Sequence, residues 1–277
     1  MKTTQTPFGT TTGRCGDVSY YNRQGDMVAR LRKNDCFHSH SVDRSANSVL
    51  MSNPVTLWKC FPSGWTPAFR RDSASVTDYN LFIAHARCSW PIYLDRIESM
   101  KCVSILTPMA VSGGVLPPVT LQMTEDTMLT DIVIGDLEID GDTTVGQWSE
   151  AVLANNLLFY NKDALLLYNG IQSMNPDLPQ ANIMATYLAL DIHDEHRLTS
   201  LLPRRVTLLN AGGRLATGFG DGQGVAWVHL RPAAKGGEWM RSTQWMAVRN
   251  ALAERYMTEE ARDRAIYSYK RLRNAMK

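Results

Sequence analysis

Apolar and polar residues alternate near the N-terminus in a way that predicts a β-hairpin. Val18 and Tyr20 alternate with polar neighbours, and Val28 and Leu31 do so less regularly, on either side of a glycine-containing turn at residues 23–26. Alternation around such a turn is typical of two antiparallel strands. The exposed edge of this hairpin could add to the sheet of a neighbouring molecule.

The pattern then takes on a helical period. The apolar residues of 42–53 gather on one side of a helix that Ser41 can cap, and Pro54 is expected to end or restart that helix. Thr77 is a suitable cap for a second helix over residues 78–88, whose apolar residues again share one face. We expect these helices to form a small unit that packs against the hairpin or against a later sheet.

Beyond residue 100 the pattern is mainly that of strands. Three apolar segments in residues 100–139 are separated by Gly-Gly, Pro-Pro and acidic turns, and five more segments follow in residues 163–233. A short helix capped by Thr143 or Thr144 lies between the two groups. Short strands at this spacing favour an antiparallel sandwich or barrel over a parallel sheet.

The last segment has the pattern of an amphipathic helix. Thr258 can cap it, two glutamates follow where the helix dipole favours acids, and basic residues lie toward the other end. Its apolar stripe consists of Ala261, Ala265, Ile266, Tyr269 and Leu272. This stripe either packs against the β lobe or docks into another subunit.

These elements together predict an α+β fold with three parts. Residues 1–98 hold the hairpin and the helical region, residues 99–256 form a predominantly β lobe of the antiparallel sandwich or barrel type, and residues 257–277 form the C-terminal helix. The chain has 277 residues, 44 % hydrophobic and 20 % charged, which is the ordinary range of globular proteins.

Charge is small in sum but uneven along the chain. The net charge of +2 is too small to require nucleic acid or an anionic membrane as a partner. Residues 121–163 carry nine acidic residues against one lysine, whereas residues 241–277 carry nine basic against four acidic ones. These segments are either two solvated faces or complementary patches by which neighbouring copies dock.

The cysteines and the N-terminal residues indicate the cellular compartment in which we expect the protein. Five cysteines lie far apart, with no C-x-x-C pair, which favours free thiols in a reducing compartment. The N-terminus lacks the apolar run of a secretory signal, and no stretch approaches the roughly 18 apolar residues of a membrane span. We therefore expect a protein of a cytoplasm, or of a particle assembled there, with no membrane span.

Two local clusters resemble chemical sites without meeting their requirements. His193 and His196 flank Asp194 and Glu195, but a zinc site of the H-E-x-x-H kind needs histidines four apart on one helix, and a third ligand would have to come from His229 or a distant carboxylate. The glycine-rich run at 218–224 lacks the lysine and hydroxyl of a phosphate loop and is interpreted as a hairpin loop. We predict no enzyme and no catalytic, cofactor or metal residues.

Tryptophans and arginines leave two further possibilities. Arginine pairs at 70–71 and 204–205 and the basic tail, with Trp58, Trp65 and Trp90 near the first pair, could bind a single strand of nucleic acid directly or line a passage for DNA. Exposed tryptophans on a β face could instead serve a soluble carbohydrate- or peptide-binding module, and the candidates are Trp227 and Trp239.

The N-terminal half carries an ordered series of short motifs. The positions that form it are Pro7, Phe8, Gly9, Gly13, Gly16, Val18, Gly25, Val28 and Arg30. The helix containing "SVTDYNLFIAHA", the Trp90-Pro91 pair and the "VSGG" turn extend the series over residues 6–120. This series resembles an uncharacterised family common in Bacteroidetes and their phages, whose members begin with Gly-Pro-Phe-Gly, then Ser-Gly-x-x-Gly, a valine, an aromatic residue, a glycine turn and a Val-x-Arg strand. Thr6 and Thr12 depart from that pattern.

The C-terminal segment "STQWMAVRNALAERYMTEEARDRAIYSY" is similar to the ends of long members associated with crAss-like bacteriophages. This resemblance implies a structural virion protein that forms an oligomeric ring in the head–tail connector or short tail. It further implies a homo-oligomer with neighbouring virion proteins, incidental contact with packaged DNA, and assembly in the host bacterial cytoplasm. Within it, Gly9, Gly13 and Gly16 would shape an N-terminal arm, residues 18–30 would supply an edge hairpin, and residues 257–276 would pack or dock as a helix.

Overall fold

A computed structural model describes residues 4–5, 11–15, 18–23, 26–31, 42–71, 76–173, 175, 178–203, 205–233 and 239–271. The chain divides into two compact units, Met1–Ser41 with Arg71–Thr77, and Val42–Arg70 with Asp78–Lys277. Some residues with predicted roles lie outside the described ranges. They are Gly9 and Gly16 of the predicted N-terminal arm and residues 272–276 of the predicted C-terminal helix. Both predicted boundaries, at 98/99 and 256/257, fall inside the second unit.

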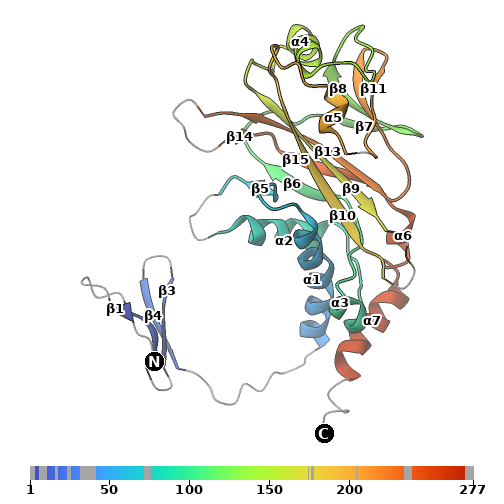
Figure 1. Ribbon diagram of the computed structural model, residues 1–277. Coiled ribbons are helices and arrows are strands. Elements are labelled where there is room, and N and C mark those ends of the chain that lie inside the picture. Colours follow the sequence, from blue (N-terminus) through green and yellow to red (C-terminus); the bar gives the residue numbers. More distant parts are fainter. Residues whose placement is uncertain are drawn as a thin grey trace. The chain divides into compact units, whose positions relative to one another are not determined.

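The first unit contains a four-stranded antiparallel sheet of order β1-β2-β3-β4, drawn in blue in Figure 1. Its strands are β1 (Thr4–Gln5), β2 (Thr11–Cys15), β3 (Val18–Arg23) and β4 (Asp26–Leu31). The β3–β4 hairpin confirms the predicted one. The strands β1 and β2 were not predicted, because Gly13 and a run of threonines replace the apolar alternation that identifies a strand.

The second unit is built on one long sheet of order β10-β9-β13-β15-β6-β5. The strands are β5 (Ala68–Phe69), β6 (Met109–Gly113), β9 (Ala164–Gln172), β10 (Ala181–Ala189), β13 (Gln223–Arg231) and β15 (Gln244–Arg249), and β14 (Met240–Arg241) pairs with β13. Their pairing is antiparallel except between β5 and β6.

A second antiparallel sheet, of order β11-β12-β8-β7, packs on one face of the long sheet. Its strands are β7 (Leu121–Met123), β8 (Thr127–Val133), β11 (Leu208–Ala211) and β12 (Arg214–Gly218). The predicted α+β fold with an antiparallel β lobe is thus confirmed. The glycine-rich run at 218–224 is not a hairpin loop as predicted, because β12 and β13 belong to different sheets.

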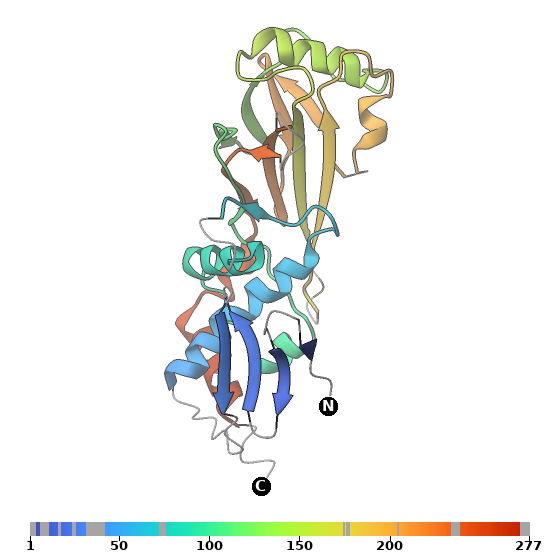
Figure 2. The same ribbon diagram turned by 90° about the vertical axis from the view of Figure 1, so that its left-hand side faces the viewer.

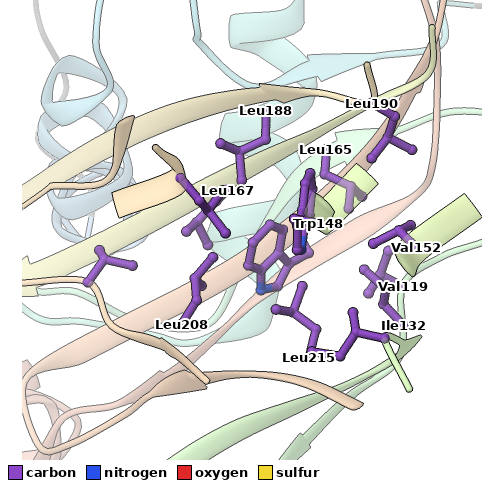
Figure 3. Packing of buried hydrophobic residues seen from close by; sticks show 14 of the residues in the cluster. Val119, Ile132, Trp148, Val152, Leu165, Leu167, Leu188, Leu190, Leu208 and Leu215 are labelled. Atoms are coloured by element: carbon purple, nitrogen blue, oxygen red, sulfur yellow. The ribbon is translucent and has the colours of Figure 1, made fainter. Parts of the chain in front are cut away.

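The core between the two sheets is centred on Trp148 of helix α4 (Val145–Asn155), which is fully buried among leucines of both sheets (Figure 3). Helix α4 begins where predicted. Thr144 is its N-cap and accepts a hydrogen bond from the Gln147 N–H, while the Gln147 side chain bonds back to the Thr144 N–H.

The helices α1 (Val42–Cys60) and α2 (Asp78–Ser89) cover the opposite face of the long sheet (Figures 1 and 2). Leu57, Phe61 and Phe82 pack there against Leu166, Tyr168 and Val228. Both faces of the long sheet are therefore covered, and nearly every residue of β9 and β13 is buried.

Pro54 does not end helix α1, contrary to the sequence prediction. The helix continues to Cys60 with Pro54 inside it. The preceding residue, Asn53, is buried and bonds both backbone groups of Ile105, since its Nδ2 donates to the Ile105 O at 2.9 Å and its Oδ1 accepts from the Ile105 N–H at 2.8 Å. This tertiary anchor holds the helix where proline removes a backbone hydrogen bond.

The C-terminal helix α7 (Glu259–Arg271) begins after Thr258, whose Oγ1 accepts a hydrogen bond from the Ala261 N–H, as predicted. Its apolar residues Ala265 and Ile266 are buried against Val49 of α1. The stripe therefore packs within the chain, but on a helix and not on the β lobe. Three short helices complete the unit: α3 (Arg96–Met100), α5 (Leu198–Leu201) and α6 (Ala251–Glu254).

Candidate functional site

The most distinctive surface feature is the open edge of the long sheet at β10. This strand pairs only with β9 among the described residues. Two hydrogen bonds just beyond the ends of the β9–β10 ladder show which residues of β10 bond to β9. They run from the Ser173 N–H to the Gln180 O and from the Leu190 N–H to the Asp163 O. Because the pattern alternates along an antiparallel pair, even-numbered residues of β10 bond to β9 and odd-numbered residues direct their backbone groups outward.

The outward backbone groups of β10 are largely unpaired. The Ala181 N–H donates to the Ser104 Oγ at 2.8 Å. For Ile183, Ala185 and Tyr187, the described part of the chain provides no partner on the open side. An incoming strand would therefore find three donors and three acceptors in register.

The sequence of β10 carries none of the features that usually protect an edge strand. Its nine residues, ANIMATYLA, contain no charged residue and no proline, and its pairing with β9 is continuous, without a bulge. Natural proteins normally blunt an edge of this length with such devices. The edge of β10 is thus suited to pairing with another chain.

A groove of about 680 Å³ lies over one face of the β9–β10 pair, near the end of the two strands. Ile171 lines it from β9, Asn182 and Met184 from β10, and Pro203 and Arg205 from the segment before β11. Strand-addition sites combine backbone pairing with pockets for alternate side chains of the added strand. The open edge and the groove together provide both parts.

A buried polar network lies elsewhere, around Asp163. Its Oδ2 is 2.8 Å from the His229 Nε2 and accepts from the Tyr160 N–H, while the Arg231 Nε donates to its Oδ1 at 2.9 Å. Burial by itself raises the pKa of Asp163, but the bonds from Arg231, Tyr160 and His229 outweigh it and hold that pKa below its usual value. Burial lowers the pKa of His229, so the imidazole is neutral and its Nε2–H donates to Asp163.

This aspartate–histidine pair is not arranged for nucleophilic catalysis. His229 lies at a pocket of about 320 Å³ that is lined mainly by prolines, asparagines and apolar residues, including Pro118, Asn156 and Phe159. The described lining holds no serine, threonine, cysteine or lysine that the histidine could activate. We interpret the network as a structural connection between β13 and the segment that precedes β9.

The sequence candidates for metal binding do not converge. His193 and His196 lie in the turn after β10, where the His196 Nδ1 is 2.7 Å from the Asp194 carboxylate. His229, considered as a third ligand, is bonded to Asp163 instead. Across the described ranges, no group of three potential metal-binding side chains is found.

The tryptophans are divided between core and surface. Trp227 is fully buried and donates its Nε1–H to the Thr217 Oγ1 at 3.3 Å, so it cannot serve a binding face as predicted. Trp58 packs against Tyr79 and Phe82 within the helical layer. Trp239 is 39 % exposed and therefore remains a candidate for binding.

Comparisons with protein-family models, with curated proteins and with solved structures find no match for this chain. Among the described residues, no helix is both long and apolar enough to cross a membrane. Cys60 and Cys102 are free thiols. Cys36, in contrast, lies outside the described residues.

Proposed function

We propose that this protein is a structural virion component whose copies assemble into a ring in the head–tail connector or short tail of a bacteriophage. The observation that carries the proposal is the open, uncharged edge of β10 with its adjacent groove. The resemblance of residues 6–120 to a phage-associated family supports the same conclusion. Neighbouring virion proteins and incidental contact with packaged DNA belong to this proposal.

The N-terminal sheet of a neighbouring copy is the proposed occupant of the β10 edge. Strand β4 is an edge strand of that sheet, and its six residues can pair along the nine residues of β10. In its register, Val18 pairs with Leu31 and Tyr20 with Ala29 across β3 and β4.

Charge would favour the approach of neighbouring copies. Residues 1–41 contain six basic and three acidic residues, whereas residues 121–163 of the second unit contain nine acidic residues and one lysine. Opposite charges orient two surfaces before they dock. A contact between two different surfaces of one chain is heterologous, and it closes into a ring when the rotation between copies permits.

Proline at position 185 tests the edge directly. Ala185→Pro removes an N–H that β9 does not use, so the fold should be retained while strand addition is blocked. Ala185→Ser keeps the N–H and is the matched control. We expect the wild type and Ala185→Ser to form large species in light scattering over a concentration series, with rings in negative-stain images, and Ala185→Pro to be monomeric with an unchanged circular dichroism spectrum.

Deletion of residues 1–35 tests the donor. The second unit should still fold, because its sheets and helices pair among themselves, but the truncated protein should not assemble. Normal assembly of the truncated protein would overturn the role of the N-terminal sheet. A wild type that is monomeric at every concentration would favour the alternative, a carbohydrate- or peptide-binding module.

A further inference from the structure

A second pocket, of about 220 Å³, lies on the helical side of the long sheet. Its floor comes from the sheet, through Val111 of β6, Leu166 and Tyr168 of β9, and Val228 and Leu230 of β13. These five side chains are at most 4 % exposed. The floor is therefore a fixed apolar surface, and the volume is below the roughly 300–1,000 Å³ of pockets for drug-sized ligands, which limits the occupant to about one ring.

Aromatic side chains border the mouth of this pocket. Trp65 and Trp239 line it from two separate segments. Tyr187 connects them, because its ring stacks on Trp65 at a centroid distance of 5.4 Å and meets Trp239 edge to face at 6.1 Å. The indole of Trp239 remains 39 % exposed. Aromatic side chains with free surface bind flat apolar groups well.

A residue of the pocket floor holds Trp65 in position. The Tyr168 hydroxyl donates a hydrogen bond to the Trp65 O at 3.0 Å. Burial raises the pKa of Tyr168 above its ordinary value, against the opposing effect of the nearby Arg241, so the hydroxyl stays protonated and keeps donating. The aromatic mouth is thus formed before any ligand arrives, which reduces the cost of ordering on binding.

Ser112 lies next to this pocket but does not direct its hydroxyl into it. It follows Val111 in β6, and successive side chains of a strand point to opposite faces of the sheet. Its Oγ is fully buried and has no hydrogen-bond partner among the described residues. A ligand in the pocket therefore does not reach this oxygen.

Arg241 supplies positive charge to the same pocket. It lines the pocket and forms no ion pair with any acidic residue that the structure describes. A guanidinium donates hydrogen bonds but accepts none. The pocket therefore favours an acceptor that carries negative charge, and a carboxylate matches the guanidinium in geometry.

We propose that this pocket binds an aromatic carboxylate, with its ring on the apolar floor below Trp65 and Trp239 and its carboxylate hydrogen-bonded to Arg241. The ligand is either a free aromatic acid or the C-terminal aromatic residue of a peptide, since both present a ring and a carboxylate. A sugar ring is disfavoured because the described lining is mainly apolar and offers few polar partners for several hydroxyls. This inference does not rest on the proposed assembly.

Calorimetric titration of the full-length protein tests the chemistry and the source of the ligand. The free-acid probes are 3-phenylpropionate and an acetylated Gly-Gly-Phe peptide with a free C-terminus, and each has its amide as the neutral control. Binding of both free acids, at least tenfold tighter than of their amides, is the expected result for a peptide terminus. Binding of 3-phenylpropionate alone assigns a free acid. The proposal is overturned if neither acid binds, if each amide binds as well as its acid, or if inorganic phosphate binds equally well.

Variants assign the contacts. Arg241→Met and Trp239→Ala should each raise the Kd of the acid at least tenfold without lowering the thermal unfolding temperature. The matched controls are Arg255→Met and Trp245→Ala, which remove an exposed arginine and a 43 % exposed tryptophan outside the pocket lining and should leave the Kd unchanged. An unchanged Kd in Arg241→Met would exclude the proposed carboxylate contact. The same conclusion would follow if a control variant raised the Kd of the acid as much as Arg241→Met does.

Discussion

Two buried polar groupings in the second unit differ in one respect, which is whether their hydrogen bonds are complete. Around Asp163, the carboxylate accepts bonds from His229, Arg231 and the Tyr160 N–H, so the charge is compensated within the chain. At the aromatic pocket, the buried Ser112 hydroxyl has no partner and Arg241 has no ion pair among the described residues. We expect the complete network to stabilise the fold, whereas the unpaired arginine is the group that the proposed carboxylate ligand would use.

Removal of the Asp163 carboxylate should have the largest effect on stability. Asp163→Asn leaves the charge of Arg231 uncompensated and weakens the hydrogen bond between residue 163 and His229. Breaking a buried pair in this way costs about 3–5 kcal/mol of folding free energy. The control is Asp142→Asn, because the Asp142–Arg197 pair is exposed on both sides and contributes at most about 1 kcal/mol. Urea unfolding measures both, and equal costs would show that the network does not stabilise the fold.

Acidification should weaken the same network in two stages. The pKa of His229 is below its ordinary value in the folded state, so the unfolded chain binds the proton more tightly and stability falls as pH drops below about 6.5. The pKa of Asp163 is also depressed, so a second loss begins below about pH 4. Unfolding temperatures from pH 7.5 to 3.5 should show both stages.

Two variants separate His229 from the other histidines in this pH profile. His229→Gln should lack the first stage, because an amide can still donate to Asp163 but does not titrate. His193→Gln, in an exposed turn, should keep that stage. A first stage that persists in His229→Gln would assign the titration to another group.

The smallest effects come from two buried serines that differ only in pairing. The Ser242 Oγ accepts a hydrogen bond from the His229 N–H at 2.9 Å, so Ser242→Ala leaves a buried donor unpaired and should cost about 1–3 kcal/mol. Ser112→Ala removes a hydroxyl that has no partner and should change the free energy of unfolding by less than about 0.5 kcal/mol. A large loss in Ser112→Ala would mean that this hydroxyl contributes to the fold.

Local signals in the sequence were sufficient for most elements. The capping residues Thr144 and Thr258 and the alternation in β3 and β4 predicted elements at the right positions, because each depends on neighbours within a few residues. The effect of Pro54 was not predictable locally, since Asn53 holds that helix through Ile105, 52 residues away. Trp227 was placed on the surface because a strand pattern does not show which faces of a sheet are covered.

Neither site could be derived from the sequence, because each depends on pairing between distant segments. The uncharged run of β10 was visible as a strand, but its position at the edge follows from the order of the whole sheet. Val111 and Arg241 are far apart in the chain, and only the packing of β6 near β14 brings them to one pocket. The strand β15 was not predicted from the sequence. Strands were predicted up to residue 233 and a helix from residue 257, with no element between them.

The central position of β15 has a consequence for synthesis on the ribosome. This strand lies between β13 and β6 and joins residues 109–113 to residues 244–249, so the long sheet cannot close until nearly the whole chain has been translated. Domains emerge N-terminal part first, at about 5–20 residues per second. The strand β6 therefore waits several seconds for its partner, and during that interval a nascent chain is most in need of a chaperone.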